Sequence, residues 1–484
     1  MSIDKSYFWA IVLILIIGVF YLGTLREGHE WGDDFSQYIL HAKNIVEGRE
    51  YSDTGYIYNR FHTLGPQTYP PIFPLCLAPV YKWFGLDLAA MKTEIVIFFA
   101  LSLLIIFLAF RNHLPSKYVF AIIALLGFSP HFWSFKDQVL SDIPFLFFLY
   151  VALLFLDRTH VSFPSQKHQL FPGILGGLFI YLAFGTRAVG LVIILCLYIF
   201  DRFKFKKLSQ FTLLATASFL VLLTSQFLLT QTHKTHWYYF QLIPRVIAEN
   251  LLDYARGFGS LWNNGYSRIF QVVLFTIISL LAGFGYLGRL KRKVTIYEIF
   301  LPAYLAVIIF WPGRQGLRFL LPVIPLYLFY TFEGVRKLGS AKFRWIEKTV
   351  FIGLMLAILT SYIGAFTKMD FGPIREGPFK KQSLELFAYV KSQTEKDGVF
   401  IFRKPRVFYL LAERRASVYH LAADGALWDF MTNIRASYLI VSRVLEDDQE
   451  FLRPFIERNR DKFDEVYGNS DFTVYKIKPH RFKE

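Results

Sequence analysis

Two adjacent carboxylates follow the first apolar run of the chain, in the stretch HEWGDDFSQYILHAKNIVEG at residues 29–48. Apolar residues recur at helical spacing directly after Asp33 and Asp34, which predicts an amphipathic helix lying on a membrane surface. Asp34 followed by Gln37 also resembles a capping box, which is a purely structural use of the same carboxylate. The two uses are compatible, because a capping position holds a carboxylate rigidly and a rigid carboxylate can take a proton from a hydroxyl.

Another carboxylate stands where a later apolar run begins, in the stretch FKDQVLSDIPFLFF. Asp142 directly precedes this run, and Pro144 stands near its first turn. Both residue types are common at helix starts, so helix capping is an alternative role here as well. An ionisable group at the edge of a membrane is costly, however, which makes Asp142 a functional candidate.

Three arginines fall on turns that we predict to face outward, where the positive-inside rule disfavours them. They are Arg187 in GTRAVG and Arg314 and Arg318 in WPGRQGLRFLLPVIP. A guanidinium group binds phosphate through two parallel hydrogen bonds. The alternative is that these arginines anchor helix ends at lipid headgroups or pair with the aspartates.

Carboxylates that activate an acceptor and arginines that hold a phosphate together suit sugar transfer from a lipid phosphate. A base would take the acceptor proton while the acceptor attacks the anomeric carbon and expels polyprenyl phosphate. The arginines would stabilise the negative charge of that leaving group.

The composition predicts that these residues are positioned by membrane-spanning helices. Of the 484 residues, 54% are hydrophobic, and the mean hydropathy is +0.37. The net charge of +16 comes from Lys and Arg scattered in short loops, which is typical of inner-face loops and excludes a nucleic-acid groove. The first apolar run lacks a small-residue cleavage site, so we expect a retained helix. Cys76 and Cys196 show neither disulfide nor zinc spacing.

About eleven apolar runs approach the roughly 20 residues that a spanning helix needs. Residues 70–84 are placed outside this set, in a helix within the first external loop at the outer interface, because another crossing would invert every later loop. Residues 171–200 are read as two short helices around GTRAVG, since one helix would bury Arg187 in the membrane. The predicted spans are residues 8–25, 95–110, 118–135, 143–156, 171–184, 189–200, 211–230, 269–287, 296–311, 319–332 and 350–366.

From residue 370 onward the chain becomes mixed and polar. Helical patterns at residues 383–393 and 407–413 alternate with strand patterns at 398–402, 437–442 and 472–477, which predicts a small α/β domain. An odd number of spans with an inner N-terminus puts this domain outside. We therefore expect a membrane module over residues 1–369 and an extracytoplasmic domain over residues 370–484.

At these residues the chain resembles the GT-C superfamily of integral-membrane glycosyltransferases. Within that superfamily, it resembles the bacterial relatives of protein mannosyltransferases and of the aminoarabinose transferase that modifies lipid A. The resemblance covers nearly the whole chain, and the order and spacing of its motifs are more specific than any one motif. It rests on WGDDFSQYILHAKNIVEGREY, TYPPIFPLCLAPVYKWFG, FSPHFWSFKDQVLSDIPFLFF, GGLFIYLAFGTRAVGL, RFLLPVIPLY, KPRVFYLLAERR and ASYLIVS.

The resemblance implies an inverting transfer from a polyprenyl-phosphate sugar to a hydroxyl acceptor on a glycan, lipid or protein. This reaction would take place at the outer face of the bacterial cytoplasmic membrane, without metal or other cofactor. The family's base lies four residues before a tyrosine, which selects Asp34 before Tyr38, although Asp33 could share its proton. Asp142 matches an acid that orients the acceptor, and the predicted donor and acceptor cavity also includes Tyr38, Tyr69, Lys136 and Asp137.

Three other functions stay open. A transporter or lipid flippase would commonly show inverted repeats and charges at the membrane midplane, and neither pattern is present. A glycan polymerase or ligase would use Arg and His in place of the first-loop aspartate, and an inactive scaffold would not need the aspartate at all. His233 and His236 lack a third residue that would complete a metal site.

Overall fold

The computed structural model describes residues 5–62, 65–66, 68–159, 169–230, 244–311, 313, 315–339 and 344–478. Its contacts divide the chain into two compact units. The helical unit comprises Met1–Leu25, Lys92–Leu229 and His236–Phe371, and the α/β unit comprises Arg26–Met91, Thr230–Thr235 and Gly372–Glu484. Residues 26–91, the segment that we predict to form the first external loop, thus group with the C-terminal residues, while a separate domain beginning at residue 370 stays a prediction.

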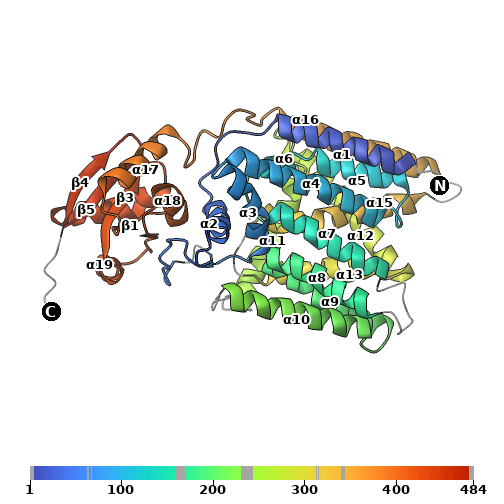
Figure 1. The fold of residues 1–484 in the computed structure, drawn as a ribbon. Coiled ribbons are helices and arrows are strands. Elements are labelled where there is room, and N and C mark those ends of the chain that lie inside the picture. Colours follow the sequence, from blue (N-terminus) through green and yellow to red (C-terminus); the bar gives the residue numbers. More distant parts are fainter. Residues whose placement is uncertain are drawn as a thin grey trace. The chain divides into compact units, whose positions relative to one another are not determined.

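The helical unit is a bundle whose long helices lie side by side (Figure 1). Closely packed pairs include α12 with α15, α7 with α8, and α9 with α13. Its helices are α1 (Lys5–Gly23), α4 (Leu88–Phe110), α5 (Ser116–Gly127), α6 (Pro130–Phe135), α7 (Asp142–Thr159), α8 (Leu170–Thr186), η2 (Ala188–Leu191), α9 (Val192–Lys204), α10 (Gln210–Thr230), α11 (Pro244–Ser260), α12 (Arg268–Arg292), α13 (Ile296–Ile309), α14 (Leu317–Leu320), η4 (Leu321–Val323), α15 (Ile324–Leu338) and α16 (Arg344–Phe366).

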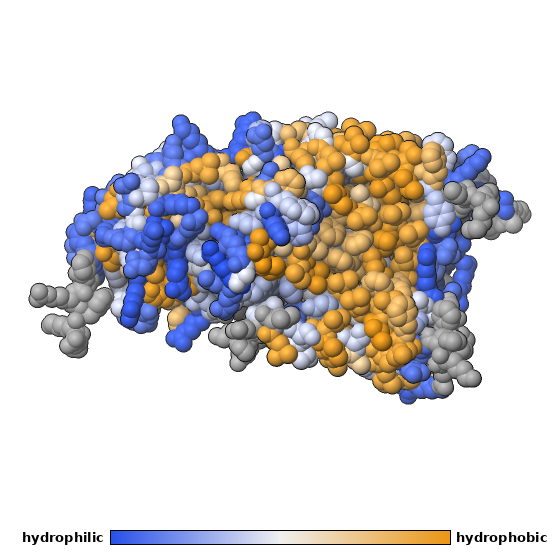
Figure 2. All heavy atoms as spheres, in the orientation of Figure 1, coloured by the Kyte–Doolittle hydropathy of each residue, from blue (hydrophilic) through white to orange (hydrophobic). Residues whose placement is uncertain are grey.

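Apolar side chains cover most of the face of this bundle that Figure 2 displays. Among the described residues, six helices are long and apolar enough to cross a membrane. All eleven predicted spans coincide with helical structure, which confirms a mostly helical fold with the character of a membrane protein. The number of eleven crossings stays a prediction, since the other helices are shorter or less apolar.

Prolines break two of the predicted helices. Residues 118–135 form α5 and α6 rather than one helix, because Pro130 favours an extended conformation at Ser129. Residues 319–332 begin as the short helices α14 and η4 and become regular only in α15, near Pro322 and Pro325. Helix α11 was not predicted, because the loop containing it showed no pattern that we could assign.

The predicted break around GTRAVG is confirmed. Helix α8 ends at Thr186, Arg187 is extended, and η2 leads into α9. A Cβ atom at Gly190 would lie only 2.7 Å from the backbone nitrogen of Phe184, so the turn folds back tightly against the end of α8.

The α/β unit contains a five-stranded mixed sheet in the order β2-β1-β3-β5-β4. Strand β1 is parallel to β2 and β3, whereas β5 is antiparallel to β3 and β4. The three predicted strands are confirmed; β2 is too short and β4 too polar to stand out in the sequence. The elements are α2 (Asp34–Glu47), α3 (Ile72–Phe84), α17 (Lys381–Gln393), β1 (Val399–Ile401), α18 (Pro405–Ala412), β2 (Ala416–Ser417), α19 (Asp424–Asn433), β3 (Ala436–Ser442), η5 (Asp448–Leu452), α20 (Arg453–Arg458), η6 (Arg460–Lys462), β4 (Phe463–Gly468) and β5 (Phe472–Ile477).

The first external loop is joined to the edge of this sheet by backbone hydrogen bonds. The amide of Ile57 donates to the carbonyl of Ala416 at 2.8 Å, and the amide of Ala416 donates to the carbonyl of Gly55 at 3.2 Å. Gly55 has a φ of +63°, and a Cβ atom there would overlap the ring of Tyr409 on α18. The loop therefore folds as part of the α/β unit, together with α2 and α3.

Helix α3 corresponds to the predicted helix at residues 70–84. Its inner face packs on α2 through buried side chains such as Phe73 and Leu77, while Leu75, Trp83 and Phe84 are exposed. The exposed apolar side chains are consistent with a helix lying on a lipid surface, and that location stays a prediction.

Candidate functional site

Helix α2 begins at Asp34, directly after the two-aspartate motif. Its N-cap is Asp33, and no side-chain capping hydrogen bond is formed there. The capping box suggested by Asp34 and Gln37 is therefore wrong: Gln37 Nε2 donates to the carbonyl of Pro66 at 3.3 Å instead. The Asp33 side chain forms no capping hydrogen bond, and both carboxylates contact other segments of the chain.

Asp34 forms a short hydrogen bond with Tyr69, the tyrosine of the YPP motif. The Tyr69 hydroxyl donates to Asp34 Oδ1 at 2.5 Å. Burial, together with the negative charge of Asp34, raises the pKa of Tyr69 well above its usual value, so this tyrosine stays protonated and remains a donor. The Asp34 side chain is 24% exposed, which makes it accessible to a reacting group.

Arg406 at the start of α18 lies beside the same tyrosine. Its side chain is fully buried, with Nη2 donating to the Pro66 carbonyl at 2.9 Å and Nη1 to the Tyr69 hydroxyl at 3.3 Å. Nη1 also lies 3.6 Å from Asp34 Oδ1. Burial alone would lower the pKa of Arg406, but Tyr69 and the two aspartates outweigh it and raise that pKa, so the guanidinium stays charged.

Asp33 also contacts helix α18, through the backbone of Val407 and the side chain of Arg406. Asp33 Oδ1 accepts a hydrogen bond from the amide of Val407 at 3.3 Å, and Oδ2 lies 3.7 Å from Arg406 Nε. Burial raises the pKa of Asp33 even though Arg406 and Lys404 act to lower it. Because the Asp33 side chain is 8% exposed, Asp34 is the better placed of the two to meet a substrate.

The backbone of Tyr69 is held by His41, one helical turn after Tyr38. His41 Nδ1 lies 2.8 Å from the carbonyl of Tyr51, and the amide of Tyr69 donates to His41 Nε2 at 3.2 Å. These partners require a neutral ring with its proton on Nδ1. Burial lowers the pKa of His41 to about 3, in agreement with a neutral ring. Tyr38 itself stacks on the Tyr69 ring with centroids 4.6 Å apart, so two predicted cavity residues do lie together with Asp34.

His41 predicts a dependence of stability on pH. The pKa of His41 is lower in the folded than in the unfolded state, so protonation favours the unfolded state. The contribution of His41 to the free energy of unfolding is therefore fully present above about pH 6.5. Below that pH it falls by about 1.4 kcal/mol per pH unit. We expect His41→Gln to weaken the fall in the thermal unfolding midpoint between pH 7.5 and pH 5. Parallel pH dependences in the wild type and the variant would show that His41 is not neutral and buried.

In the helical unit, Asp142 binds two of the three predicted arginines. Asp142 Oδ1 accepts a hydrogen bond from Arg187 Nη1, and Oδ2 accepts one from Arg318 Nε at 2.8 Å. The Asp142 side chain is 2% exposed, whereas the two arginines are 17% and 19% exposed. The alternative in which the arginines pair with an aspartate is therefore confirmed for both. Arg314 lies outside the described residues.

Lys136 and Asp137, predicted to line the cavity, form an ion pair with each other. Lys136 Nζ lies 2.6 Å from Asp137 Oδ2 and 3.7 Å from the centre of the Trp133 ring. Both side chains are almost completely buried. Their predicted contact with substrate stays a prediction.

Sequence reasoning overlooked Arg406 and His41. The KPRVFYLLAERR motif was noticed only as part of a resemblance, and a histidine within a helical pattern gives no signal of its own. A usable hint was that an arginine followed by an apolar helix must find a partner if it is buried. Which partner it finds depends on contacts between distant segments.

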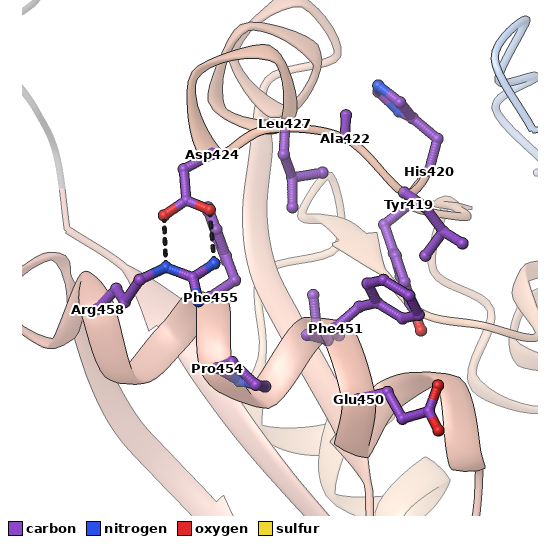
Figure 3. A pocket seen from close by; sticks show the side chains of 12 residues that line it. Tyr419, His420, Ala422, Asp424, Leu427, Glu450, Phe451, Pro454, Phe455 and Arg458 are labelled. Carbon is purple, nitrogen blue, oxygen red and sulfur yellow. Dashed lines mark hydrogen bonds and ion pairs between the residues drawn. The ribbon is translucent and has the colours of Figure 1, made fainter.

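A separate cavity of about 160 Å³ lies among α19, α20 and the loop after β2 (Figure 3). Its most prominent polar pair is already satisfied, since Arg458 binds both carboxylate oxygens of Asp424. The Tyr419 hydroxyl is likewise bound to Asp448. This cavity shares no residue with the group formed by Asp33, Asp34, Tyr69 and Arg406.

Among the described residues, no three His, Cys, Asp or Glu side chains gather as metal ligands would. His233 and His236 lie outside the described part of the chain.

The sequence matches no protein-family model and no curated protein with which it was compared. The fold, in contrast, resembles solved membrane glycosyltransferases. ArnT from Cupriavidus metallidurans in the apo state aligns with a TM-score of 0.63 and 11% identity over 98% of each chain. The same protein bound to undecaprenyl phosphate aligns with a TM-score of 0.60 and 11% identity, over 97% of this chain and 98% of ArnT.

The archaeal oligosaccharyltransferase AglB from Archaeoglobus fulgidus, in complex with an inhibitory peptide and a dolichol-phosphate, is also similar. Its TM-score is 0.61 at 13% identity, over 90% of this chain and 69% of AglB. The chain shares the fold of ArnT and of AglB. This likeness in fold agrees with the resemblance read from the sequence motifs.

Proposed function

We propose that this protein is an inverting glycosyltransferase that moves a sugar from a polyprenyl-phosphate donor to a hydroxyl acceptor. The observation that carries the proposal is Asp34, a partly exposed carboxylate held by the Tyr69 hydroxyl and close to a buried guanidinium. Likeness in fold to ArnT along nearly the whole chain supports the choice of donor.

In this reaction Asp34 takes the proton of the acceptor hydroxyl as its oxygen attacks the anomeric carbon. The bond between that carbon and the phosphate oxygen breaks, and polyprenyl phosphate leaves with the bonding electrons. Attack from the opposite side inverts the configuration, and Asp34 ends as a neutral acid.

Arg187, Arg314 and Arg318 are the groups that we assign to the donor phosphate. Charged hydrogen-bond donors that already face the leaving phosphate lower the activation barrier of the transfer, because they need no rearrangement as negative charge develops. In the described structure Asp142 supplies the counter-charge of Arg187 and Arg318, so donor binding would exchange part of that pairing for the phosphate. Asp142 would then orient the acceptor.

We place the reaction at the outer face of the bacterial cytoplasmic membrane, with a glycan, a lipid or a protein as the acceptor. The sequence resemblance also assigns Tyr38, Lys136 and Asp137 to the binding of donor and acceptor. No metal or other cofactor takes part, since a carboxylate base and cationic phosphate ligands suffice for the chemistry.

The test is a transfer assay with protein purified in detergent. Radiolabelled undecaprenyl-phosphate sugars would be supplied one at a time with membrane extract as acceptor, and the labelled product counted. We expect transfer from at least one donor, with release of undecaprenyl phosphate. A folded protein that transfers no sugar from any of these donors would contradict the proposal and favour a transporter or a scaffold.

A further inference from the structure

We propose that Arg406 is a positioning residue for Asp34, so that the C-terminal part of the chain completes the active site. This inference rests on the proposed function and extends it to a segment to which no role was assigned. Arg406 acts through Tyr69 and through its charge, and it touches neither substrate nor leaving group.

The Arg406 guanidinium contacts three separate parts of the first external loop. One nitrogen binds the carbonyl of Pro66, another binds the Tyr69 hydroxyl, and Nε faces Asp33. The nitrogen that binds Tyr69 is also the one nearest to Asp34. A single side chain of α18 therefore organises the carboxylates and the tyrosine at once.

The surroundings of Arg406 fix its orientation. Its guanidinium carbon lies 5.1 Å from the centre of the Tyr56 ring and 5.6 Å from that of Tyr69. The close approach of the loop depends on Gly65, which has a φ of +112° and whose added Cβ atom would lie only 3.1 Å from the Tyr69 hydroxyl oxygen. A planar guanidinium group held by these contacts has little freedom to move.

The hydrogen bonds run in one direction, from Arg406 to Tyr69 and from Tyr69 to Asp34. Because Arg406 donates to the Tyr69 oxygen, the hydroxyl proton of Tyr69 is directed at Asp34 Oδ1. Each donor polarises the next, which strengthens the bond to the carboxylate. The positive charge also favours the ionised carboxylate, which is the form that a general base needs.

Asp33 connects this arrangement to the backbone of α18. The amide of Val407, directly after Arg406, donates to Asp33 Oδ1. The first turn of α18 thus binds one aspartate through its backbone and reaches the other through the Arg406 side chain. The second aspartate of the motif fixes the start of α2 against α18, and Asp34 is left for chemistry.

The test compares wild type with Arg406→Gln and Arg406→Lys, using a measurement that needs no turnover. A carbodiimide with an amine nucleophile modifies protonated carboxyl groups, and peptide mass spectrometry reports the labelling of Asp34 at each pH. We expect the labelling midpoint of Asp34 to rise by about 1–3 pH units in Arg406→Gln, because an opposite charge within about 4–6 Å is lost.

Arg414→Gln is the matched control. Arg414 is another buried arginine of the α/β unit, but its guanidinium binds the backbone carbonyls of Lys391 and Thr394. The control should lower stability without moving the Asp34 midpoint. An unchanged midpoint in Arg406→Gln, or an equal shift in Arg414→Gln, would overturn the proposal.

Transfer kinetics supply a second measurement. We expect Arg406→Gln to lower kcat about 10- to 100-fold with little change in the KM for the donor, since misplacing a catalytic group affects the chemical step. Arg406→Lys keeps the positive charge but lacks the planar guanidinium group. Relative to Arg406→Gln, it should therefore restore the labelling midpoint of Asp34 more fully than it restores kcat. This variant decides the matter if Arg406→Gln does not fold: a midpoint as in the wild type with reduced kcat supports positioning, and unchanged kcat overturns it.

The two proposals fail in different ways. A folded wild type that transfers no sugar would contradict the proposed function, and the labelling would still show whether Arg406 governs Asp34. Normal transfer with an unshifted midpoint in Arg406→Gln would contradict the positioning role alone.

Discussion

Asp34→Asn is expected to reduce kcat for sugar transfer by about 10²- to 10⁴-fold, which is the usual contribution of a general base. The amide keeps the shape of the side chain and still accepts a hydrogen bond from Tyr69, but it cannot take a proton. The measurement is initial-rate transfer by protein whose monodispersity and unfolding midpoint match the wild type. The KM for the donor should change little.

Asp33→Asn is the matched control for this result. Asp33 lies beside Asp34 in the sequence and is also close to Arg406, but it is bound to the amide of Val407 and is less exposed. Its replacement should affect stability more than kcat. Full transfer by Asp34→Asn combined with inactivity of Asp33→Asn would reverse the two roles, and loss in both would indicate a shared proton.

Asp142→Asn is expected to destabilise the helical unit by about 2–4 kcal/mol and to lower turnover. Removing one partner from a buried ion pair costs about 3–5 kcal/mol, and the partial exposure of Arg187 and Arg318 reduces this value. The neutral amide leaves two guanidinium groups without their shared counter-charge. Thermal unfolding in detergent measures the first effect, and transfer per folded molecule measures the second.

Asp157→Asn separates these two effects. Asp157 belongs to the same helix, α7, and its Oδ2 lies 2.8 Å from His113 Nε2, so its replacement also changes a carboxylate that has a hydrogen-bonding partner. It should lower stability while turnover per folded molecule is preserved. Equal turnover losses in Asp142→Asn and Asp157→Asn would indicate that Asp142 has a structural role only.

Arg187→Gln and Arg318→Gln test the assignment of the arginines to the donor. If they bind the leaving phosphate, each replacement should raise the KM for the donor as well as lower kcat. If they serve only Asp142, the KM for the donor should stay near its wild-type value.

Local patterns were sufficient to predict most of the helices and three of the strands. Long apolar runs predict helices because the membrane accepts only backbone whose hydrogen bonds are satisfied within the segment. The break at Arg187 was also predictable, since a charge in the middle of a helix is costly in lipid. The break before Pro130 was missed although proline marked it, because the apolar pattern continued across it.

The amino-acid sequence by itself determined the membrane character of this protein and its mostly helical fold, and it contains the carboxylates and arginines that could do the proposed chemistry. Tertiary structure decided which of these groups meet: Asp142 with Arg187 and Arg318 in one unit, and Asp34 with Tyr69 and Arg406 in the other. The physical reason is that hydropathy and spacing act over a few turns of chain. The partner of a buried charge, in contrast, is chosen by whichever distant segment can satisfy it.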